Sequence, residues 1–218
     1  MKYEYLKQQD DFVYTEIFDW NVYQAFPEEL RNENILDIGG HYGMFDIYCN
    51  QYNPKQIITV EANPNNFIKL LKNTKDIRNL KAINAAVTTN TGEFITISDD
   101  GCQSQINKGN LNVSTVSLVD VVNWFPDNED ILLKMDIEGA EYPLFLNSPS
   151  FIFRRFKKIY IELHEESIAG KGNTIKMLNN YIQYLGFNSV WEGVFFTNTS
   201  GGKHANDDIA VFKYERIS

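Results

Sequence analysis

The stretch Ile35-Leu36-Asp37-Ile38-Gly39-Gly40-His41-Tyr42-Gly43 decides the fold of this chain. Its apolar residues predict a short buried strand, and its glycines predict a sharp turn into a helix that begins near Met44. A strand that turns directly into a helix leaves free backbone N–H groups and the positive end of the helix dipole at the carboxyl edge of the sheet. Glycines at such a turn let a flat ligand lie against bare backbone. The stretch therefore predicts a ligand site as well as a strand.

The second strand, Ile57-Ile58-Thr59-Val60-Glu61, ends in a carboxylate. In nucleotide-binding α/β proteins an acid at this place holds a ribose. The first turn, however, has the form Asp-x-Gly-x-x-x-Gly and lacks a glycine reserved for a pyrophosphate. A carboxylate at the rim of the turn, Asp37, repels a diphosphate and favours an ammonium or a sulfonium group. The pattern favours S-adenosylmethionine over NAD, and a plain strand–helix turn without a ligand is the alternative.

The overall composition narrows the function further. The 218 residues are enough for one well-buried core, and the net charge of −9 argues against a general nucleic-acid binder. No stretch approaches the length of a membrane span or of a signal-peptide core, so we expect no membrane association. Cys49 and Cys102 show no metal or disulfide spacing, which predicts free thiols and a cytoplasmic protein. The oligomeric state is left open.

We predict two parts in the chain, an aromatic-rich N-terminal cap over residues 1–32 and one α/β domain over residues 33–218. Apolar strands alternate with helices, which is typical of a mostly parallel sheet covered on both faces. The last two strands are joined without a helix and are expected to form an antiparallel pair at one edge. The predicted strands cover residues 35–38, 56–61, 80–87, 93–97, 113–117, 131–136, 158–164, 187–191 and 208–214. A polar loop over residues 99–110 is expected near the ligand edge.

A second acidic segment, Lys134-Met135-Asp136-Ile137-Glu138-Gly139-Ala140-Glu141, follows the strand over residues 131–136. Ligands in open α/β sheets bind beyond the carboxyl ends of the strands. Glu138 and Glu141 are predicted to begin the next helix, where the helix dipole favours anions. Asp136 is less simply explained, because an acid at the end of a buried strand loses hydration unless something pairs with it. We therefore expect Asp136 to contact the cofactor or the acceptor.

The three histidines differ in their expected roles. His164 closes the predicted strand over residues 158–164 at the same edge, where an imidazole can take a proton from a hydroxyl, and a purely structural hydrogen bond is an equally good interpretation. His41 is expected to shape the glycine turn or to touch the cofactor, and His204 lies in the last loop with the weakest case. Asp136, Glu138 and His164 can jointly suit a divalent metal, but the sequence does not fix their spacing, and metal binding stays open.

Four blocks of the sequence together resemble the FkbM-type family of S-adenosylmethionine-dependent methyltransferases, over residues 34–165. They are residues 35–43, Val60-Glu61-Ala62-Asn63-Pro64, Asn84-Ala85-Ala86-Val87 with Gly92-Glu93, and residues 133–141. The Asp-Ile-Glu-Gly-Ala-Glu block is the most specific of them. The resemblance implies a class I methyltransferase, a Rossmann-like, doubly wound and mostly parallel seven-stranded sheet. It also implies O-methylation of a hydroxyl on a sugar or other small polyol-like acceptor, which is a small molecule or a glycan.

The same resemblance assigns expected roles to residues. The expected cofactor-binding residues are Asp37, Gly39, Gly40, His41, Gly43, Glu61, Ala62, Asn84, Ala85, Ala86 and Asp136, and the expected catalytic residues are Asp136, Glu138 and His164. Glu61 would bind both ribose hydroxyls, and the region of Ala85 and Ala86 would flank the adenine. His41 stands where the family more often has Asn, which leaves its contact open. Two other classes remain as alternatives, an NAD-type nucleotide-dependent oxidoreductase and a non-catalytic cofactor-binding domain.

Overall fold

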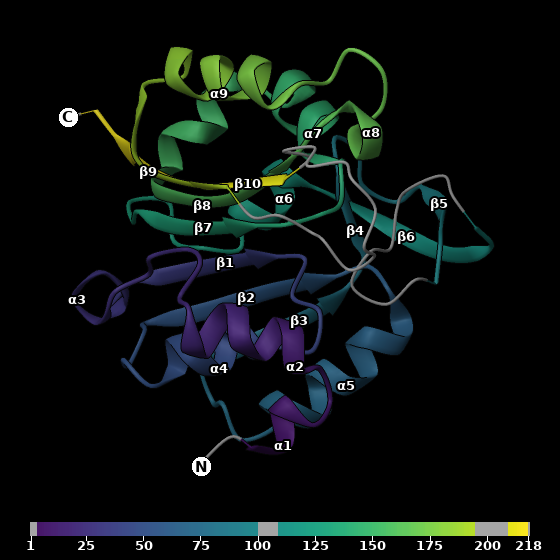
Figure 1. Ribbon diagram of the computed structural model, residues 1–218, viewed down its shortest axis with the longest axis vertical. Coiled ribbons are helices and arrows are strands. Elements are labelled where there is room, and N and C mark those ends of the chain that lie inside the picture. The colour runs from purple at the N-terminus through teal and green to yellow at the C-terminus, as the bar shows by residue number, and fades with distance from the viewer. Residues whose placement is uncertain (1–3, 100–108, 195–208, 218) are drawn as a thin grey trace.

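The computed structural model describes residues 4–99, 109–194 and 209–217 and is built around a seven-stranded sheet (Figure 1). The strand order is β3-β2-β1-β7-β8-β10-β9. These strands are β1 (Asn34–Ile38), β2 (Gln56–Glu61), β3 (Leu80–Asn84), β7 (Ile131–Met135), β8 (Phe156–His164), β9 (Phe187–Val194) and β10 (Ile209–Arg216). The first five in the order are parallel neighbours, and β10 runs antiparallel to β8 and to β9. The predicted doubly wound sheet with an antiparallel edge pair is confirmed.

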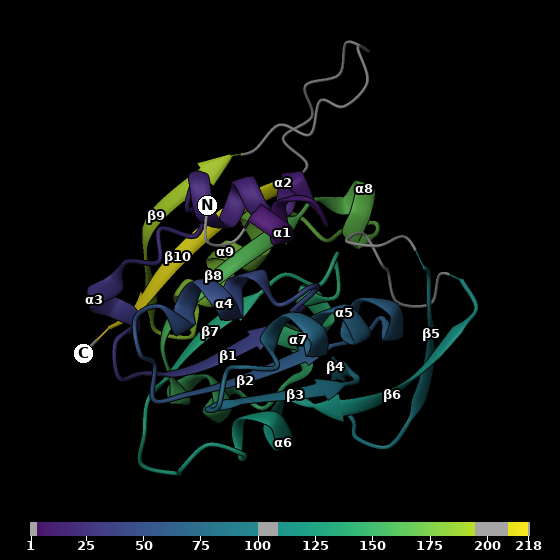
Figure 2. The same cartoon turned by 90° about the horizontal axis from the view of Figure 1, so that it is seen from below.

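Helices cover both faces of this sheet (Figures 1 and 2). The helices α4 (Met44–Asn50) and α5 (Pro64–Thr74) lie on one face, and α6 (Leu118–Val122), α7 (Glu141–Asn147) and α9 (Ile175–Tyr184) lie on the other. The start of α5 follows from its sequence, because the Asn63 side chain accepts from Asn65 N and Asn66 N while Pro64 occupies the first turn. Shorter elements are the 3₁₀ helix η3 (Ser150–Arg155) and α8 (Glu166–Ala169). Within the described ranges no helix has the length and apolar character needed to cross a bilayer.

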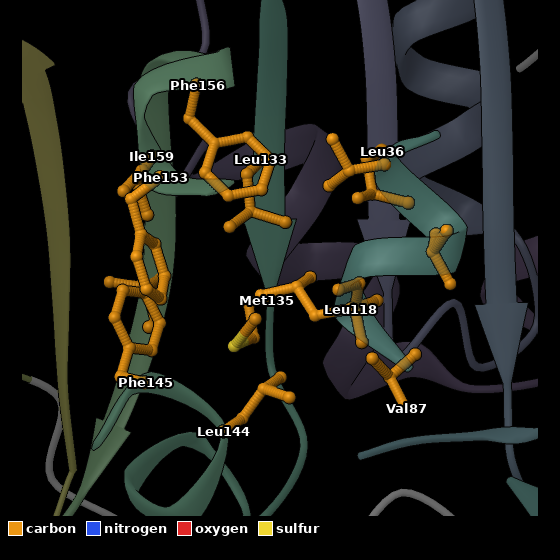
Figure 3. Close-up of a cluster of buried hydrophobic side chains, with 14 of the residues drawn as sticks. Leu36, Val87, Leu118, Leu133, Met135, Leu144, Phe145, Phe153, Phe156 and Ile159 are labelled. Carbon is orange, nitrogen blue, oxygen red and sulfur yellow. The ribbon is translucent and has the colours of Figure 1, made fainter. Parts of the chain in front are cut away.

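The alternation of side chains along β1 separates two buried clusters. Leu36 and Ile38 join the larger one, between the sheet and the helices α6, α7 and α9, where Leu36, Leu133, Met135 and Phe156 lie close together (Figure 3). Ile35 joins the second cluster, which includes most of α4. Asp37 follows the same alternation as Ile35, so its side chain lies on the α4 face of the sheet.

The second cluster also takes up the N-terminal segment. This segment consists of α1 (Glu4–Lys7), α2 (Asp11–Tyr14), the π-helix η1 (Thr15–Asp19) and α3 (Pro27–Leu30). Tyr14, Ile17 and Tyr23 are buried against the α4 face, whereas Tyr5, Phe12, Trp20 and Phe26 are exposed. Fewer aromatic side chains of this segment therefore pack on the sheet than their number in the sequence suggests.

The prediction of a single strand over residues 80–87 is wrong. The chain leaves the main sheet at Ala85 and continues as β4 (Ala86–Thr88) in a separate three-stranded sheet with β6 (Leu111–Ser117) and β5 (Phe94–Ile97), in the order β4-β6-β5. The Asn84 side chain donates to the carbonyl oxygens of Glu61 at 2.8 Å and Ala62 at 3.0 Å. These two bonds tie the end of β3 to the end of β2, while the backbone continues into the small sheet.

The predicted helix beginning at Glu138 is also wrong, because α7 begins only at Glu141. Glu138 and Gly139 have positive φ angles of 55° and 95°, which helical residues do not adopt. At Gly139 a Cβ would lie 2.8 Å from Ala169 Cα, so only glycine fits there. Cys102, His204, most of the predicted polar loop and the final loop lie outside the described residues.

Candidate active site

A cavity lies at the carboxyl edge of the main sheet, where the neighbouring strands β2, β1 and β7 end. The backbone of residues 39–41, the residues after β2 and the residues after β7 all line it, as expected at this edge of an open sheet. The predicted site residues that line the cavity are Gly39, Gly40, His41, Glu61, Ala62, Ala85, Ala86, Asp136 and Glu138. Four others, Asp37, Gly43, Asn84 and His164, are not part of its lining.

The glycine turn is held against the ends of two strands. Gly39 N and Gly40 N donate to the Val60 carbonyl at 2.9 and 3.2 Å, which joins the turn to β2. Gly39 has a φ of +86°, and a Cβ on it would lie 1.8 Å from the Asp136 carbonyl oxygen. The turn therefore has to be glycine, because any side chain would push the backbone off the end of β7.

Glu61 joins the turns after β1 and β2. Its Oε2 accepts from His41 N at 2.7 Å and its Oε1 accepts from Asn63 N at 2.8 Å. Burial raises the pKa of Glu61 to about 7, although both backbone donors oppose that rise. Each carboxylate oxygen keeps a further lone pair, so the group can accept additional hydroxyl donors from the cavity.

The part of the cavity beyond Glu61 is apolar. Ala85 and Ala86 line it, and the side chains of Val60, Val87 and Ile97 complete that surface. Ala85 N donates to the Glu61 carbonyl at 3.2 Å, which holds this stretch next to the ribose-binding carboxylate predicted from the sequence. An apolar surface beside a hydrogen-bonding carboxylate suits a nucleoside.

His41 lies within the glycine turn that leads into α4, and its ring is stacked on that of Tyr42, with the two centroids 3.7 Å apart. Burial and the neighbouring Lys134 and Lys69 lower the pKa of His41 to about 3. The imidazole is therefore neutral at physiological pH. It lines the cavity as an uncharged polar group.

Asp37 lies beneath the turn, and its ionic partner is Lys134 of β7. The two residues are directly paired in the parallel register, with Lys134 Nζ 3.3 Å from Asp37 Oδ1, and both side chains are buried. Lys134 Nζ also donates to the Gly39 carbonyl at 2.8 Å and lines the cavity. The sequence places Asp37 at the rim of the turn, but the structure places its carboxylate behind Lys134, on the α4 side.

Asp46 of α4 adds a second carboxylate to this buried group. Burial, together with the charge of Asp37, raises the pKa of Asp46 well above its usual range. The raised pKa favours the protonated form of Asp46, and the ion pair in this group is the one between Lys134 and Asp37. The sequence alone does not predict that Asp37 or Asp46 lies close to Lys134. This contact depends on β1 and β7 being neighbours in the sheet.

An acidic cluster, formed by Asp136, Glu138, Glu162 and His164, lies at the β7 end of the cavity. His164 Nε2 is 3.4 Å from Glu162 Oε1 and 3.5 Å from Glu138 Oε2, and one ligand atom from each of Asp136, Glu138 and His164 lies within 4.8 Å of the others. On its other side His164 Nδ1 is 3.2 Å from Glu141 Oε1. The structure therefore brings together the three residues whose spacing the sequence left open.

The charges in this cluster affect one another. Burial and then Glu162 raise the pKa of Asp136 well above its usual range, and burial raises that of Glu138 to about 7. For His164, burial lowers the pKa, but Glu141 and Glu162 outweigh it and hold the pKa well above the usual value. The raised pKa favours the protonated ring, and an imidazolium has no lone pair to accept a hydroxyl proton.

The N-terminal segment supplies cavity residues that the sequence did not single out. Val13, Glu16, Ile17 and Tyr23 line the cavity. Glu16 lies on η1, and burial together with Glu162 raises its pKa to about 8. The aromatic richness of the segment was the available signal, and it indicated only that the segment packs near the site.

Solved structures with the same fold include a methyltransferase FkbM from Methylobacillus flagellatus KT, 16% identical, with a TM-score of 0.54 and 91% of this chain aligned to 47% of that one. This chain therefore spans about half the length of that relative. Another is TrmK of M. capricolum in complex with S-adenosylhomocysteine, 14% identical, with a TM-score of 0.53 over 91% of this chain and 68% of that one. A Streptococcus agalactiae protein of the NADB-Rossmann superfamily is 14% identical, with a TM-score of 0.52 over 90% and 66%.

No curated protein matches the sequence significantly. The family model described as the methyltransferase FkbM domain matches residues 37–189, which include the glycine turn, Glu61, the acidic cluster and most of the parallel part of the sheet. This match covers well over half of the chain. The protein belongs to the FkbM family of S-adenosylmethionine-dependent methyltransferases, and its cofactor is S-adenosylmethionine.

Proposed function

We propose that the protein transfers the methyl group of S-adenosylmethionine to a hydroxyl oxygen of a sugar or similar small polyol-like acceptor, a small molecule or a glycan. The observation on which this rests is the convergence of Asp136 and Glu138 on the same cavity as Glu61. Carboxylates are good acceptors for the several hydroxyl groups of such a molecule. The FkbM family resemblance points to the same acceptor class.

Within this proposal the cofactor lies across the glycine turn. Glu61 accepts hydrogen bonds from both ribose hydroxyls, the backbone of residues 39–41 contacts the methionine part, and Ala85 and Ala86 flank the adenine. Lys134 holds the Gly39 carbonyl and so keeps this backbone in place. Asp37 acts through Lys134, and Asn84 acts by fixing the turn after β2.

The sulfonium is a strong electrophile, so the main task of the protein is to align the acceptor oxygen with the methyl carbon and the sulfur. The acceptor oxygen forms a bond to the methyl carbon, the carbon–sulfur bond breaks, and its electron pair stays on sulfur as the neutral thioether. Asp136 takes the hydroxyl proton as the oxygen attacks. We prefer Asp136 to His164 for this role because Asp136 lines the cavity and His164 does not.

The N-terminal segment, residues 1–32, is proposed to act as a cap that helps to choose the acceptor. Its Glu16 and Tyr23 side chains reach the cavity from outside the region that matches the family. We also propose that the protein is located in the cytoplasm. The buried free thiol of Cys49 agrees with such a reducing compartment.

The test is a methyl-transfer assay with isotopically labelled S-adenosylmethionine and a panel of hexoses, glycosides and alditols. Each active acceptor is compared with its analogue in which one hydroxyl is replaced by hydrogen, and the product is identified as a methyl ether by mass spectrometry. Methylation of amines or carbon nucleophiles in place of hydroxyls contradicts the proposal. Binding of S-adenosylhomocysteine without turnover of any acceptor selects the non-catalytic alternative.

A further inference from the structure

The acidic cluster gathers three carboxyl groups around one imidazole, largely out of water. Asp136, Glu138 and Glu162 all approach His164, and the nearest buried lysine, Lys134, is already engaged with Asp37 and the Gly39 carbonyl. Carboxylates that are brought together away from water need a compensating cation.

Two buried atoms at the centre of the cluster have no hydrogen-bond partner among the described residues. They are His164 Nε2, on a side chain with no exposed area, and Asp136 Oδ1. Buried polar atoms are nearly always satisfied, so a pair of unsatisfied ones at one point indicates a missing ligand. Asp136 and His164 are two of the three residues whose ligand atoms lie within 4.8 Å of one another.

The surroundings of His164 match those of a metal-binding histidine. Such histidines generally donate their second ring N–H to a carboxylate, which fixes the ring and directs the other nitrogen at the metal. Here Glu141 Oε1 lies 3.2 Å from His164 Nδ1, and the same oxygen accepts from Ile137 N at 3.0 Å. Tyr142 also donates its hydroxyl to the His164 carbonyl at 2.6 Å. Glu141 therefore holds the ring and Tyr142 holds the backbone of His164, with Nε2 directed at the carboxylates.

The backbone before α7 places the third ligand. Glu138 has a φ of 55°, a left-handed conformation that is uncommon outside glycine and asparagine. This turn carries the Glu138 carboxylate back to His164 instead of out along the helix, at 3.5 Å from Nε2. Strained backbone of this kind is typical of functional sites.

We propose that Asp136, Glu138 and His164 bind a divalent cation at the β7 end of the cofactor cavity, with Glu162 as a further carboxylate beside it. One imidazole nitrogen with carboxylate oxygens suits Mn²⁺ or Fe²⁺ better than Mg²⁺, which prefers oxygen ligands alone. Asp136 and Glu138 line the cavity, so the cation would face it and hold an acceptor oxygen there. Only that last role rests on the proposed function.

The test is a titration of the purified protein with Mn²⁺ alone. Binding is monitored by electron paramagnetic resonance, as the loss of the signal of the free ion. One site per chain is expected, with electron-spin-echo modulation from a histidine nitrogen. Asp136→Asn, Glu138→Gln and His164→Gln should each weaken Mn²⁺ binding more than tenfold, and Glu141→Gln about 10- to 100-fold by loosening the histidine. His41→Asn should keep the nitrogen modulation.

Asp127→Asn is the matched control, because it removes one carboxylate at the opposite edge of the sheet, where Asp127 is 90% exposed. S-adenosylhomocysteine binding by each variant shows that its cavity has folded, and Glu138, with a side chain 15% exposed, is the substitution least disruptive to packing. No Mn²⁺ binding by the wild type, binding without histidine modulation, or equal binding by Glu138→Gln and Asp127→Asn each overturns the proposal. Failure to methylate hydroxyl groups would leave this result unchanged, so the two proposals fail separately.

Discussion

Gly39 lies against Asp136 so closely that a Cβ on the glycine would fall 1.8 Å from the Asp136 carbonyl oxygen. Two segments almost 100 positions apart in the sequence thus share one contact, between the turn after β1 and the end of β7. This contact fixes the backbone that forms the cavity next to the acidic cluster. It also gives the sharpest test of the turn.

Gly39→Ala is expected to destabilise the protein and to abolish cofactor binding, because the backbone must move away from β7. Gly92→Ala is the control, since Gly92 has nearly the same φ, 84°, but nothing lies within 4 Å of its added Cβ. The free energy of unfolding of the control should fall only by the cost of placing a non-glycine residue in a left-handed conformation, about 1–2 kcal/mol. Thermal unfolding and calorimetry with S-adenosylhomocysteine measure both effects, and equal losses in the two variants would show that strain alone is responsible.

Glu61→Gln is expected to weaken S-adenosylhomocysteine binding by about 10- to 100-fold, the size of one or two hydrogen bonds to a charged acceptor. The amide oxygen can still accept from one backbone N–H, but the NH₂ group opposes the other donor and the ribose hydroxyls. Glu93→Gln, at an exposed position, is the control. Calorimetry at pH 8 gives the two dissociation constants, and an affinity unchanged in Glu61→Gln would remove Glu61 from the ribose site.

The pH dependence of binding should follow the same residue. The ribose hydroxyls donate to the ionised carboxylate, and burial raises the pKa of Glu61 to about 7. Affinity should therefore rise as the pH increases through 7 and fall about tenfold per unit well below it. For folding without ligand the sign is opposite, since the stability from the raised pKa is present below about 4.5 and lost as the pH rises through 7. Glu61→Gln should give a flat binding profile over this range.

Asp136→Asn is expected to lower the rate of methyl transfer about 10²- to 10⁴-fold, the usual contribution of general acid–base catalysis. Its affinity for S-adenosylhomocysteine should change far less than its turnover, because the substitution keeps the shape of the side chain. Asp127→Asn should show the wild-type rate. Turnover that survives in Asp136→Asn would move the proton acceptor to another residue of the cavity.

Lys134→Met is expected to cost about 3–5 kcal/mol of unfolding free energy, because Asp37 is left as a buried charge without a partner. Lys157→Met breaks the partly exposed pair with Glu33 and should cost no more than about 1 kcal/mol. The double variant Asp37→Asn/Lys134→Met should recover much of the loss. Chemical denaturation provides all these values, and additive losses in the double variant would contradict the pairing.

The sequence predicted the sheet and the place of the site because both depend on local patterns. Each strand is a short apolar run that ends in a recognisable turn, so Glu61 and Asp136 could be assigned to the edge where ligands bind. The break at Ala85 could not be predicted, because the residues on either side have the same strand-forming character. What separates them is the Asn84 side chain bonding to the next strand.

The individual roles within the site were harder to predict for the same reason. Asp37 alternates with Leu36 and Ile38, which in retrospect places it on the α4 face and away from the cavity. The charge of His164 depends on Glu141 and Glu162, and the position of Glu16 depends on how the N-terminal segment folds back over α4. Such contacts are set by tertiary structure, and no local sequence pattern contains them.

Glu61 already holds the loops after β1 and β2 together through His41 N and Asn63 N. A ligand that arrives there meets a receptor whose backbone is in its final shape, so little conformational entropy is lost on association. Most of the interaction energy then appears directly as affinity. Because the loops are held in place, they cannot adapt to a nucleoside of a different shape. The site therefore selects its ligand by shape complementarity rather than by conformational change.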